Sequence, residues 1–427
     1  MKERKRSQLA WGFYDWANSA FATAVMAGFF PLFFKEYWAT SLERTESTFW
    51  LGVVNSTASL FIVLLAPLLG ALADHLGRRK GFLLILALLG IVMTAGLSLA
   101  TRGAWQLAML IYLFAVTGFM GANVFYDALL MSVSGKSGQE SDRVSAFGFA
   151  LGYLGGGLLF ALCVLMTQQP QWFRLADSAS AVKLSFLLVA VWWAIFTVPL
   201  LVYVKEPHHA RATAVAAIRA AAGRVLQTLR ELRVLRQAAI FLAAYWLYID
   251  GVGTVVRMAI DYGISIGFES GQLIIAMLIT QFIGFPATFL YGRMTRYVGV
   301  RTGIFFGLAV YALVTVWGSQ IQAVWEFYAL AVIIGLVQGG VQALSRSLFV
   351  RLIPASQAAE LFGFYNMVGK SAAVIGPVMM GWIGVLTGNP RLAILSLLVL
   401  FVAGFLLLLC VRVPPQDANA ASSRVDT

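Results

Sequence analysis

The sequence predicts an all-α membrane protein in which twelve transmembrane helices form two six-helix bundles of repeated design. Composition is the first observation: 60% of the 427 residues are hydrophobic, 12% are charged, and the mean hydropathy is +0.81. A soluble protein of this length could not bury so much apolar surface. The number of apolar runs and the distribution of positive charge along the chain are the second and third observations.

Twelve runs are long enough to cross a bilayer, which takes roughly 20 apolar residues per helix. The runs are continuously apolar rather than alternating, which favours helices over a β-barrel. Charged or turn-forming residues separate most of them. In order, the runs lie near residues 12–37, 48–73, 82–100, 104–131, 144–168, 184–204, 237–262, 268–290, 301–318, 324–350, 359–387 and 391–412.

Three regions follow from these runs: a first six-helix bundle over 1–204, a cytoplasmic linker over 205–236, and a second six-helix bundle with a short tail over 237–427. In the linker, apolar residues recur every three or four positions and arginines occupy the other positions. That pattern is typical of a basic helix lying on the membrane; a solvated linker helix is the alternative. Short sequence similarities between the bundles favour internal repeats, as in transporters whose halves rock around a central site.

Positive charge gathers on one side of the predicted membrane. If the N-terminus is cytoplasmic, 22 of the 31 Lys and Arg residues lie on the inner side, six lie on the outer side, and three lie inside spans. This distribution obeys the positive-inside rule and places both termini in the cytoplasm. The net charge of +12 therefore reflects topology, and no nucleic-acid partner is expected. We expect a multi-pass protein of the bacterial inner membrane, in contact with lipids and monomeric.

The most specific motif is GALADHLGRRK at residues 70–80. Gly70 would allow two helices to approach closely, Asp74 stands at a helix end, and Gly77 turns the chain before Arg78. The motif resembles the signature loop between spans two and three of the major facilitator superfamily. The resemblance implies that Asp74 and Arg78 help to latch the two halves in the outward-facing state. A plain positive-inside loop is the alternative, and the second copy, at 292–302, lacks the aspartate.

Three further stretches narrow this resemblance: YDWANSAF in span one, GGVQALSRSLF (339–349) in span ten and FGFYNMVGKSAAVIGP (362–377) in span eleven. They are similar to the Atg22-like vacuolar effluxer family, in its bacterial branch. The resemblance covers nearly the whole chain, over 11–410. It implies a transporter, and the fungal members are associated with amino-acid export from the vacuole.

Charged residues inside the bilayer are candidates for a functional site because each is costly unless it is paired or wetted. Asp250 and Lys370 are both near mid-depth and could form an ion pair, functional or purely structural. Arg346 could hold an anionic group or extend to the headgroups. Asp15 and Asp127 lie near the inner ends of spans; the alternatives are a helix-start residue for Asp15 and a partner of a loop cation for Asp127.

Polar uncharged residues complete the predicted site because they suit a wet cavity for a small polar solute. The candidate substrate or proton-relay residues are Asp15, Asn18, Asn123, Asp127, Asp250, Gln342, Arg346, Asn366 and Lys370. The candidate latch residues are Gly70, Asp74, Gly77 and Arg78.

These features predict a secondary transporter that moves a small polar solute by alternating access. An amino acid is one substrate, and a sugar or an organic anion is the alternative. Without a phosphate-binding loop for ATP, any drive would come from an ion such as the proton, with Asp250 as the relay. The three histidines all lie in predicted loops, so neither an enzyme, a metal site nor a cofactor is expected. A non-transporting sensor is the least favoured class.

Overall fold

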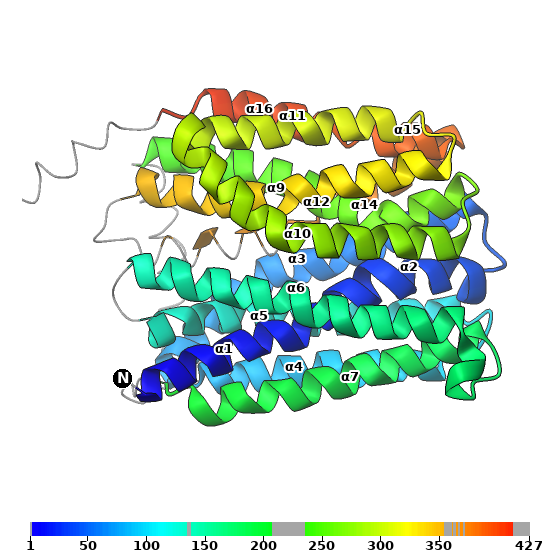
Figure 1. Ribbon diagram of the computed structural model, residues 1–427, viewed down its shortest axis with the longest axis horizontal. Coiled ribbons are helices and arrows are strands. Elements are labelled where there is room, and N and C mark those ends of the chain that lie inside the picture. Colours follow the sequence, from blue (N-terminus) through cyan, green and yellow to red (C-terminus); the bar gives the residue numbers. More distant parts are fainter. Residues whose placement is uncertain are drawn as a thin grey trace, which may run out of the picture.

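The computed structural model describes residues 2–134, 138–206, 235–353, 361, 364–365, 368–369 and 372–412. The described chain consists almost entirely of helices that run along one axis (Figure 1). The first group of helices comprises α1 (Lys2–Ala20), η1 (Phe21–Phe29), α2 (Phe30–Phe33), η2 (Phe34–Trp38), α3 (Arg44–Leu76), α4 (Arg79–Gly96), η3 (Leu97–Leu99), α5 (Trp105–Ser134), α6 (Gly138–Gln168), η4 (Pro170–Phe173) and α7 (Ser178–Tyr203).

The second group follows the linker and packs beside the first (Figure 1). Its elements are α9 (Arg236–Ser265), α10 (Ser270–Val298), α11 (Val300–Gly318), α12 (Val324–Leu352), α14 (Ile375–Thr387), α15 (Pro390–Leu395) and α16 (Leu398–Leu409). Below, the first group is called the N-half and the second the C-half. The interfacial helix predicted for the linker lies almost entirely outside the described residues.

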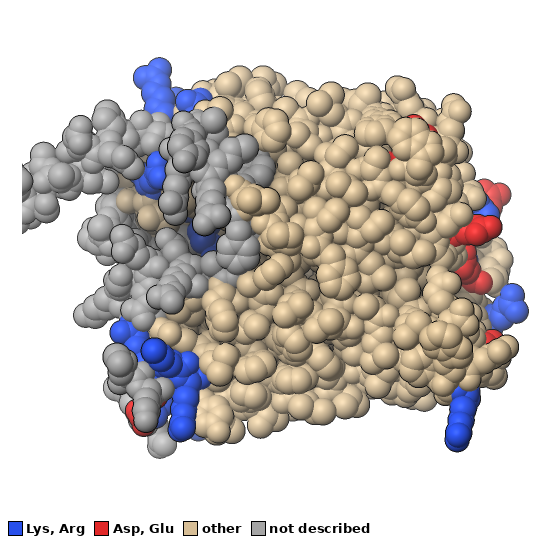
Figure 2. All heavy atoms as spheres, in the orientation of Figure 1, with Lys and Arg blue, Asp and Glu red and all other residues tan. Residues whose placement is uncertain are grey.

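Eleven helices among the described residues are long and apolar enough to cross a membrane. The twelfth predicted span, 359–387, is described as a helix over Ile375–Thr387, 13 residues long. Tan, uncharged atoms cover the whole middle of the visible face in Figure 2, as a bilayer requires. The predicted class, an all-α multi-pass membrane protein, is therefore confirmed.

Helix pairing repeats between the halves, as internal duplication predicts. In the N-half, α4 packs on α5 and α7, and α3 packs on α5. In the C-half, α11 packs in the same way on α12 and α16, and α10 packs on α12. The halves meet mainly through α3 with α14 and α6 with α10, and α9 also contacts η1, α2 and α3. Glycines at 148, 152 and 156 let α6 pack closely against Asp15, Ser19 and Thr23 of the first span.

The two ends of the molecule differ in charge. The end with the N-terminus carries Arg78, Arg79 and Lys80 together with Arg4, Lys5 and Arg6, and is called the basic end (Figure 2). The opposite end carries cations and carboxylates together (Figure 2). There Asp177 caps α7 by accepting the Ser180 backbone N–H at 2.7 Å. Hydrogen bonds from the Ser180 side chain and backbone hold the pKa of Asp177 below its ordinary value, so the cap is ionised at neutral pH.

Candidate functional site

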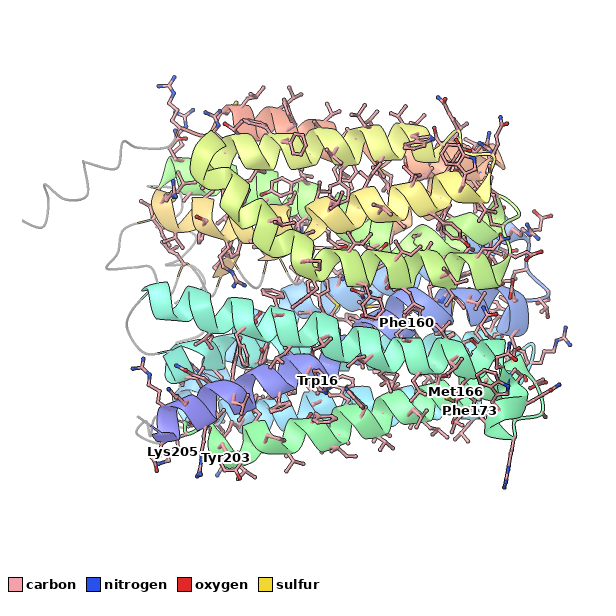
Figure 3. All side chains as sticks on the ribbon, viewed as in Figure 1. Trp16, Phe160, Met166, Phe173, Tyr203 and Lys205 are labelled. Carbon is pink, nitrogen blue, oxygen red and sulfur yellow. The ribbon has the colours of Figure 1, made fainter. Side chains whose placement is uncertain are left out.

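Large side chains fill the interior of each half. In Figure 3, Trp16 and Phe160 lie within the N-half, whereas Tyr203 and Lys205 lie at the basic end. Aromatic stacking continues toward the boundary with the C-half, where Trp11 stacks on Tyr126 with ring centroids 4.3 Å apart. The polar residues described below are therefore held by rigid, packed helices.

A buried ion pair joins the halves at the opposite end. The ammonium of Lys35, in η2, lies 2.8 Å from the carboxylate of Asp261, in α9, and both side chains are less than 5% exposed. The Thr48 hydroxyl, in α3, donates to the same carboxylate at 2.6 Å. Lys35 also donates to Thr48 at 2.8 Å and to Ser265 at 2.6 Å. These four residues form the Lys35–Asp261 network, which links the two halves.

Further contacts close the same end. Arg44 donates to the backbone oxygen of Ile264 at 2.8 Å, and Ser270 donates to Glu36 at 2.5 Å. Where α3 crosses α14, a methyl group on Gly52 would overlap the Pro377 carbonyl. By contrast, a Cβ on Gly70, toward the basic end of α3, would meet no described atom within 4 Å. The molecule is thus shut at the opposite end.

Asp250 ties two helices of the C-half together. Its carboxylate, 1% exposed, accepts the backbone N–H groups of Ile375 at 2.8 Å and Gly376 at 3.1 Å, and the Thr254 hydroxyl lies 3.3 Å away. The carboxylate therefore stands at the N-terminus of α14, where unpaired N–H groups and the helix dipole favour negative charge. The predicted partner Lys370 lies outside the described residues, as does Asn366.

Asn18 and Asn123 join two helices of the N-half. The Asn18 amide donates to the Asn123 side-chain oxygen at 2.7 Å, and both residues are at most 2% exposed. Asn123 donates in turn to the Phe119 backbone oxygen at 3.0 Å. The structure thus gives this predicted pair a helix-linking contact between α1 and α5. Such a bond is costly to break in a dry interior because it would strand two buried amides.

Three predicted charges converge on Tyr126 at the boundary between the halves. Asp15, 8% exposed, lies against Gly148 of α6, which also borders the Tyr126 hydroxyl, and Asp127 follows Tyr126 in the chain. Arg346, from the C-half, lies over the ring of Phe149 in the N-half at 5.3 Å. The buried Tyr126 hydroxyl has no hydrogen-bond partner among the described residues. The half-buried Gln342 precedes Arg346 by one helical turn.

Arg257, a cation on α9 with a buried nitrogen, was not among the predicted site residues. Arg257 lies on α9 between Asp250 and Asp261, and its buried Nη1 atom has no hydrogen-bond partner in the described part of the chain. Asp250, Thr254, Arg257 and Asp261 follow one another at intervals of four, three and four, which places them on one helix face. This spacing was the available signal in the sequence.

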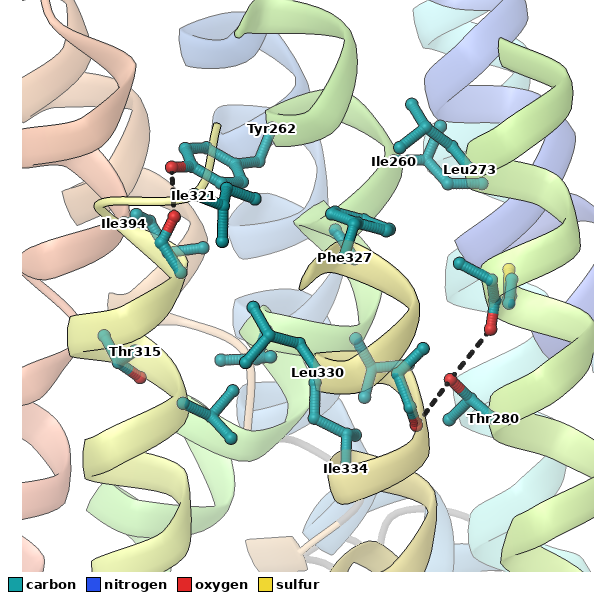
Figure 4. Close-up of a pocket in the computed structure, with 18 of the residues that line it drawn as sticks. Ile260, Tyr262, Leu273, Thr280, Thr315, Ile321, Phe327, Leu330, Ile334 and Ile394 are labelled. Carbon is teal, nitrogen blue, oxygen red and sulfur yellow. Dashed lines mark hydrogen bonds between the residues drawn. The ribbon is translucent and has the colours of Figure 1, made fainter. Parts of the chain in front are cut away.

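A cavity of about 100 Å³ lies elsewhere, within the C-half between α9, α10, α11 and α12 (Figure 4). Its walls are mainly apolar, with Phe327, Leu330 and Ile334 among them, and Tyr262 donates to the Gly318 backbone oxygen at 2.6 Å. None of the predicted site residues lines it. Its apolar surface does not suit a polar solute.

Comparison with known proteins decides the family. Residues 41–421 match the model of the family described as vacuole effluxer Atg22 like. The chain belongs to the Atg22-like family. An MFS-type transporter of Bacillus subtilis, YxiO, is 36% identical over 99% of this chain and 98% of its own length. Autophagy-related protein 22-1 of Aspergillus niger is 28% identical over 67% of this chain and 50% of its own length, so the alignment spans half of that relative.

Solved structures show the same fold. A crystal structure of the nucleoside transporter NupG matches with a TM-score of 0.67 over 95% of this chain and 99% of that chain, at 13% identity. This likeness confirms the major facilitator fold predicted for the Atg22-like chain. The Atg22-like chain is therefore an integral, multi-pass membrane transporter, and the expectation that it is not an enzyme is confirmed by its relatives.

In this Atg22-like chain, the predicted latch loop lies at the basic end. Gly77 takes a φ of 60° and ends α3, as a turn-forming glycine does. Arg78 is exposed, while Arg79 donates to the Ala128 backbone oxygen at 3.1 Å within the N-half. The Asp74 side chain lies outside the described part. No described atom lies within 4 Å of a Cβ placed on Gly70, so the close helix approach predicted there stays a prediction. The latch role remains a prediction.

Proposed function

We propose that this transporter is a secondary active carrier that moves a small polar solute by alternating access. The observation that carries the proposal is the asymmetry of the boundary between the halves. A buried network and tightly packed helices close one end, while Asp15 and Asp127 of the N-half and Arg346 of the C-half lie around Tyr126 and Phe149, nearer the basic end. Two packed halves with contacts concentrated at one end are suited to rocking between two states.

The positive-inside rule assigns the basic end to the cytoplasm, in a bacterial inner membrane. The conformation described here is then the inward-facing one, with the Lys35–Asp261 network as the outer gate. An amino acid is the first substrate candidate, because one end of such a solute would suit Asp15 and Asp127 and the other would suit Arg346. A sugar or an organic anion is the alternative.

Transport in proteoliposomes tests this proposal. Labelled amino acids, sugars and organic anions are offered in exchange assays, and we expect flux of at least one amino acid. Arg346→Gln should reduce that flux at least tenfold, because the cation that faces the N-half is removed. Arg351→Gln is the matched control, since Arg351 lies on the same helix but is exposed. Equal flux in the two variants would contradict the role of Arg346, and no flux of any solute class would contradict the carrier.

Proton coupling through Asp250 is part of the proposal, supported by its near-complete burial and its place at a helix N-terminus. Asp250→Asn should abolish flux driven by a pH gradient because the amide cannot take up a proton. It should also lower the melting temperature slightly, since capping interactions contribute about 1 kcal/mol. Thr254→Val is the control, because it removes a neighbouring hydroxyl but keeps the carboxylate. Unchanged pH-driven flux in Asp250→Asn would exclude this carboxylate as the relay.

A further inference from the structure

The apolar cavity of the C-half lies against the segment of α9 that carries the outer gate. Ile260 and Tyr262 are in the wall of the cavity, and Asp261 stands between them in the chain. The Asp261 carboxylate pairs with Lys35 of the N-half at 2.8 Å. Because successive residues of a helix point in different directions, this segment holds the gate on one side and bounds the cavity on another.

A second wall of the cavity also contacts the N-half. Gln281, of α10, lines the cavity and donates to the Thr23 hydroxyl of η1 at 2.6 Å. Its neighbour Thr280 donates to the backbone oxygens of Ala276 at 3.1 Å and Ala331 at 3.2 Å, which ties α10 to α12 (Figure 4). Two of the helices around the cavity therefore take part in contacts between the halves.

The wall has few polar groups left for a polar ligand. Four of its polar side chains already donate hydrogen bonds to protein groups, namely Tyr262, Thr280, Gln281 and Thr315. Gln338 is the remaining polar residue of the wall, and it is half-buried. A water molecule in a cavity needs roughly two to four polar partners. The wall therefore favours a dry cavity.

The size of the cavity selects a small ligand. Its volume of about 100 Å³ is comparable to that of engineered apolar cavities, about 150 Å³, which bind benzene or xenon. Atoms that border a void lack van der Waals partners on that side, and filling the void restores those contacts. A phospholipid acyl chain is several times too large to fit. The cavity is partly open, so a small molecule can enter it.

We infer that this cavity binds a small apolar molecule, either a single aromatic ring or a short hydrocarbon, and that the bound molecule stabilises the closed outer gate. Filling the cavity favours the conformation in which its walls are in place, and those walls adjoin Asp261 and include Gln281. The site is regulatory, since none of the predicted substrate residues lines it. The inference goes beyond the proposed transport function and does not depend on which solute is carried.

Thermal stability of the purified full chain tests the binding, with benzene as the probe and pyridine as its polar match. We expect benzene to raise the melting temperature, and pyridine to need a roughly tenfold higher concentration, because its ring nitrogen must give up water. Equal protection by both rings, or by neither, would overturn the inference. Loss of the benzene effect in phosphatidylglycerol nanodiscs, at the same free concentration, would indicate an acyl chain as the occupant and would also overturn it.

Variants at Leu330 distinguish the cavity from benzene dissolved in detergent. Leu330 is in the wall and is 6% exposed (Figure 4). Leu330→Phe fills the cavity and should remove the protection by benzene, whereas Leu330→Ala enlarges it and should extend protection to naphthalene. Leu336→Phe is the matched control, since Leu336 is on the same helix but 45% exposed, and it should keep the benzene effect. Each shift is measured against the ligand-free melting temperature of the same variant. Full protection of Leu330→Phe by benzene would overturn the inference.

Hydrogen exchange tests the effect on the gate. Benzene should slow the exchange of backbone amides around Lys35 and Asp261 roughly tenfold in the parent protein, because opening of the gate becomes less frequent, and should have no such effect in Leu330→Phe. Thermal protection without slower exchange at these residues would overturn the link to the gate. Neither measurement uses transport, so a failure here is distinguishable from a failure of the carrier proposal.

Discussion

Replacing Lys35 by Met should shift the transporter toward its outward-open state. The change leaves the Asp261 carboxylate buried without its cation, and breaking a buried ion pair in this way costs about 3–5 kcal/mol. Because the network exists only where the halves meet, the cost falls on the closed outer gate. Double replacement by Lys35→Met and Asp261→Leu should have the opposite effect, because apolar packing of similar volume is neutral or favourable by about 1–4 kcal/mol.

A single cysteine reports the state of the gate. Ser56 lies one turn from Gly52 on α3, on the face toward α14, and is 9% exposed. Ser56→Cys is introduced with Cys410→Ser, which removes the exposed native thiol. A membrane-impermeant thiol reagent added outside should label Lys35→Met faster than the parent, and the double variant more slowly. Arg102→Gln is the control, because it changes an exposed cation at the same end of the molecule, and it should leave labelling unchanged. Equal labelling of all variants would show that the network is not the gate.

Replacing Gly52 by Ala should nearly abolish transport. The added methyl group would overlap the Pro377 backbone, which cannot rotate away as a side chain can. Overpacking typically costs about 1–3 kcal/mol, and each 1.4 kcal/mol changes a population about tenfold. The cost applies where α3 and α14 are in contact, so the closed gate would be depopulated. The same cysteine reporter should then react rapidly from outside.

Gly96→Ala is the matched control for this change. Gly96 ends α4, and a Cβ there would have its nearest described neighbour, an Ile111 methyl carbon, at an ordinary contact distance of 3.6 Å. Both variants should fold, because neither glycine has a positive φ. Full transport by Gly52→Ala would mean that the close crossing of α3 and α14 is not needed in the cycle.

The fold could be predicted because a bilayer permits few backbone conformations. Every long apolar run must satisfy its own N–H and C=O groups, so hydropathy alone located eleven of the described helices. The start of α14 at Ile375 was not predictable in this way. Hydropathy does not show that Asp250 would accept N–H groups from a helix beginning inside the predicted span. The ion pair with Lys370 stays a prediction, because Lys370 lies outside the described residues.

The candidate site was predicted in part, for a physical reason. The cost of charge in the membrane singled out Asp15, Asp127 and Arg346, which lie in the region of Tyr126 and Phe149 at the boundary between the halves. The same reasoning missed Lys35 because it stands at the end of an apolar run and is one of the six cations that the charge distribution assigns to the outer side. Turns of π-helix in η1 and η2 continue the first span through Trp38 and bury this lysine against Asp261. Contacts between halves depend on packing that a linear pattern does not contain.

The buried pair of Lys35 and Asp261 also bears on how readily the protein can cycle. Water would solvate both ions once the outer end opens, and this hydration recovers much of the attraction lost when they separate. An apolar contact of the same size would not be solvated favourably on opening and would therefore stabilise the closed gate. An ion pair that water can solvate therefore keeps the closed and open states close in free energy, which a carrier needs in order to turn over in either direction.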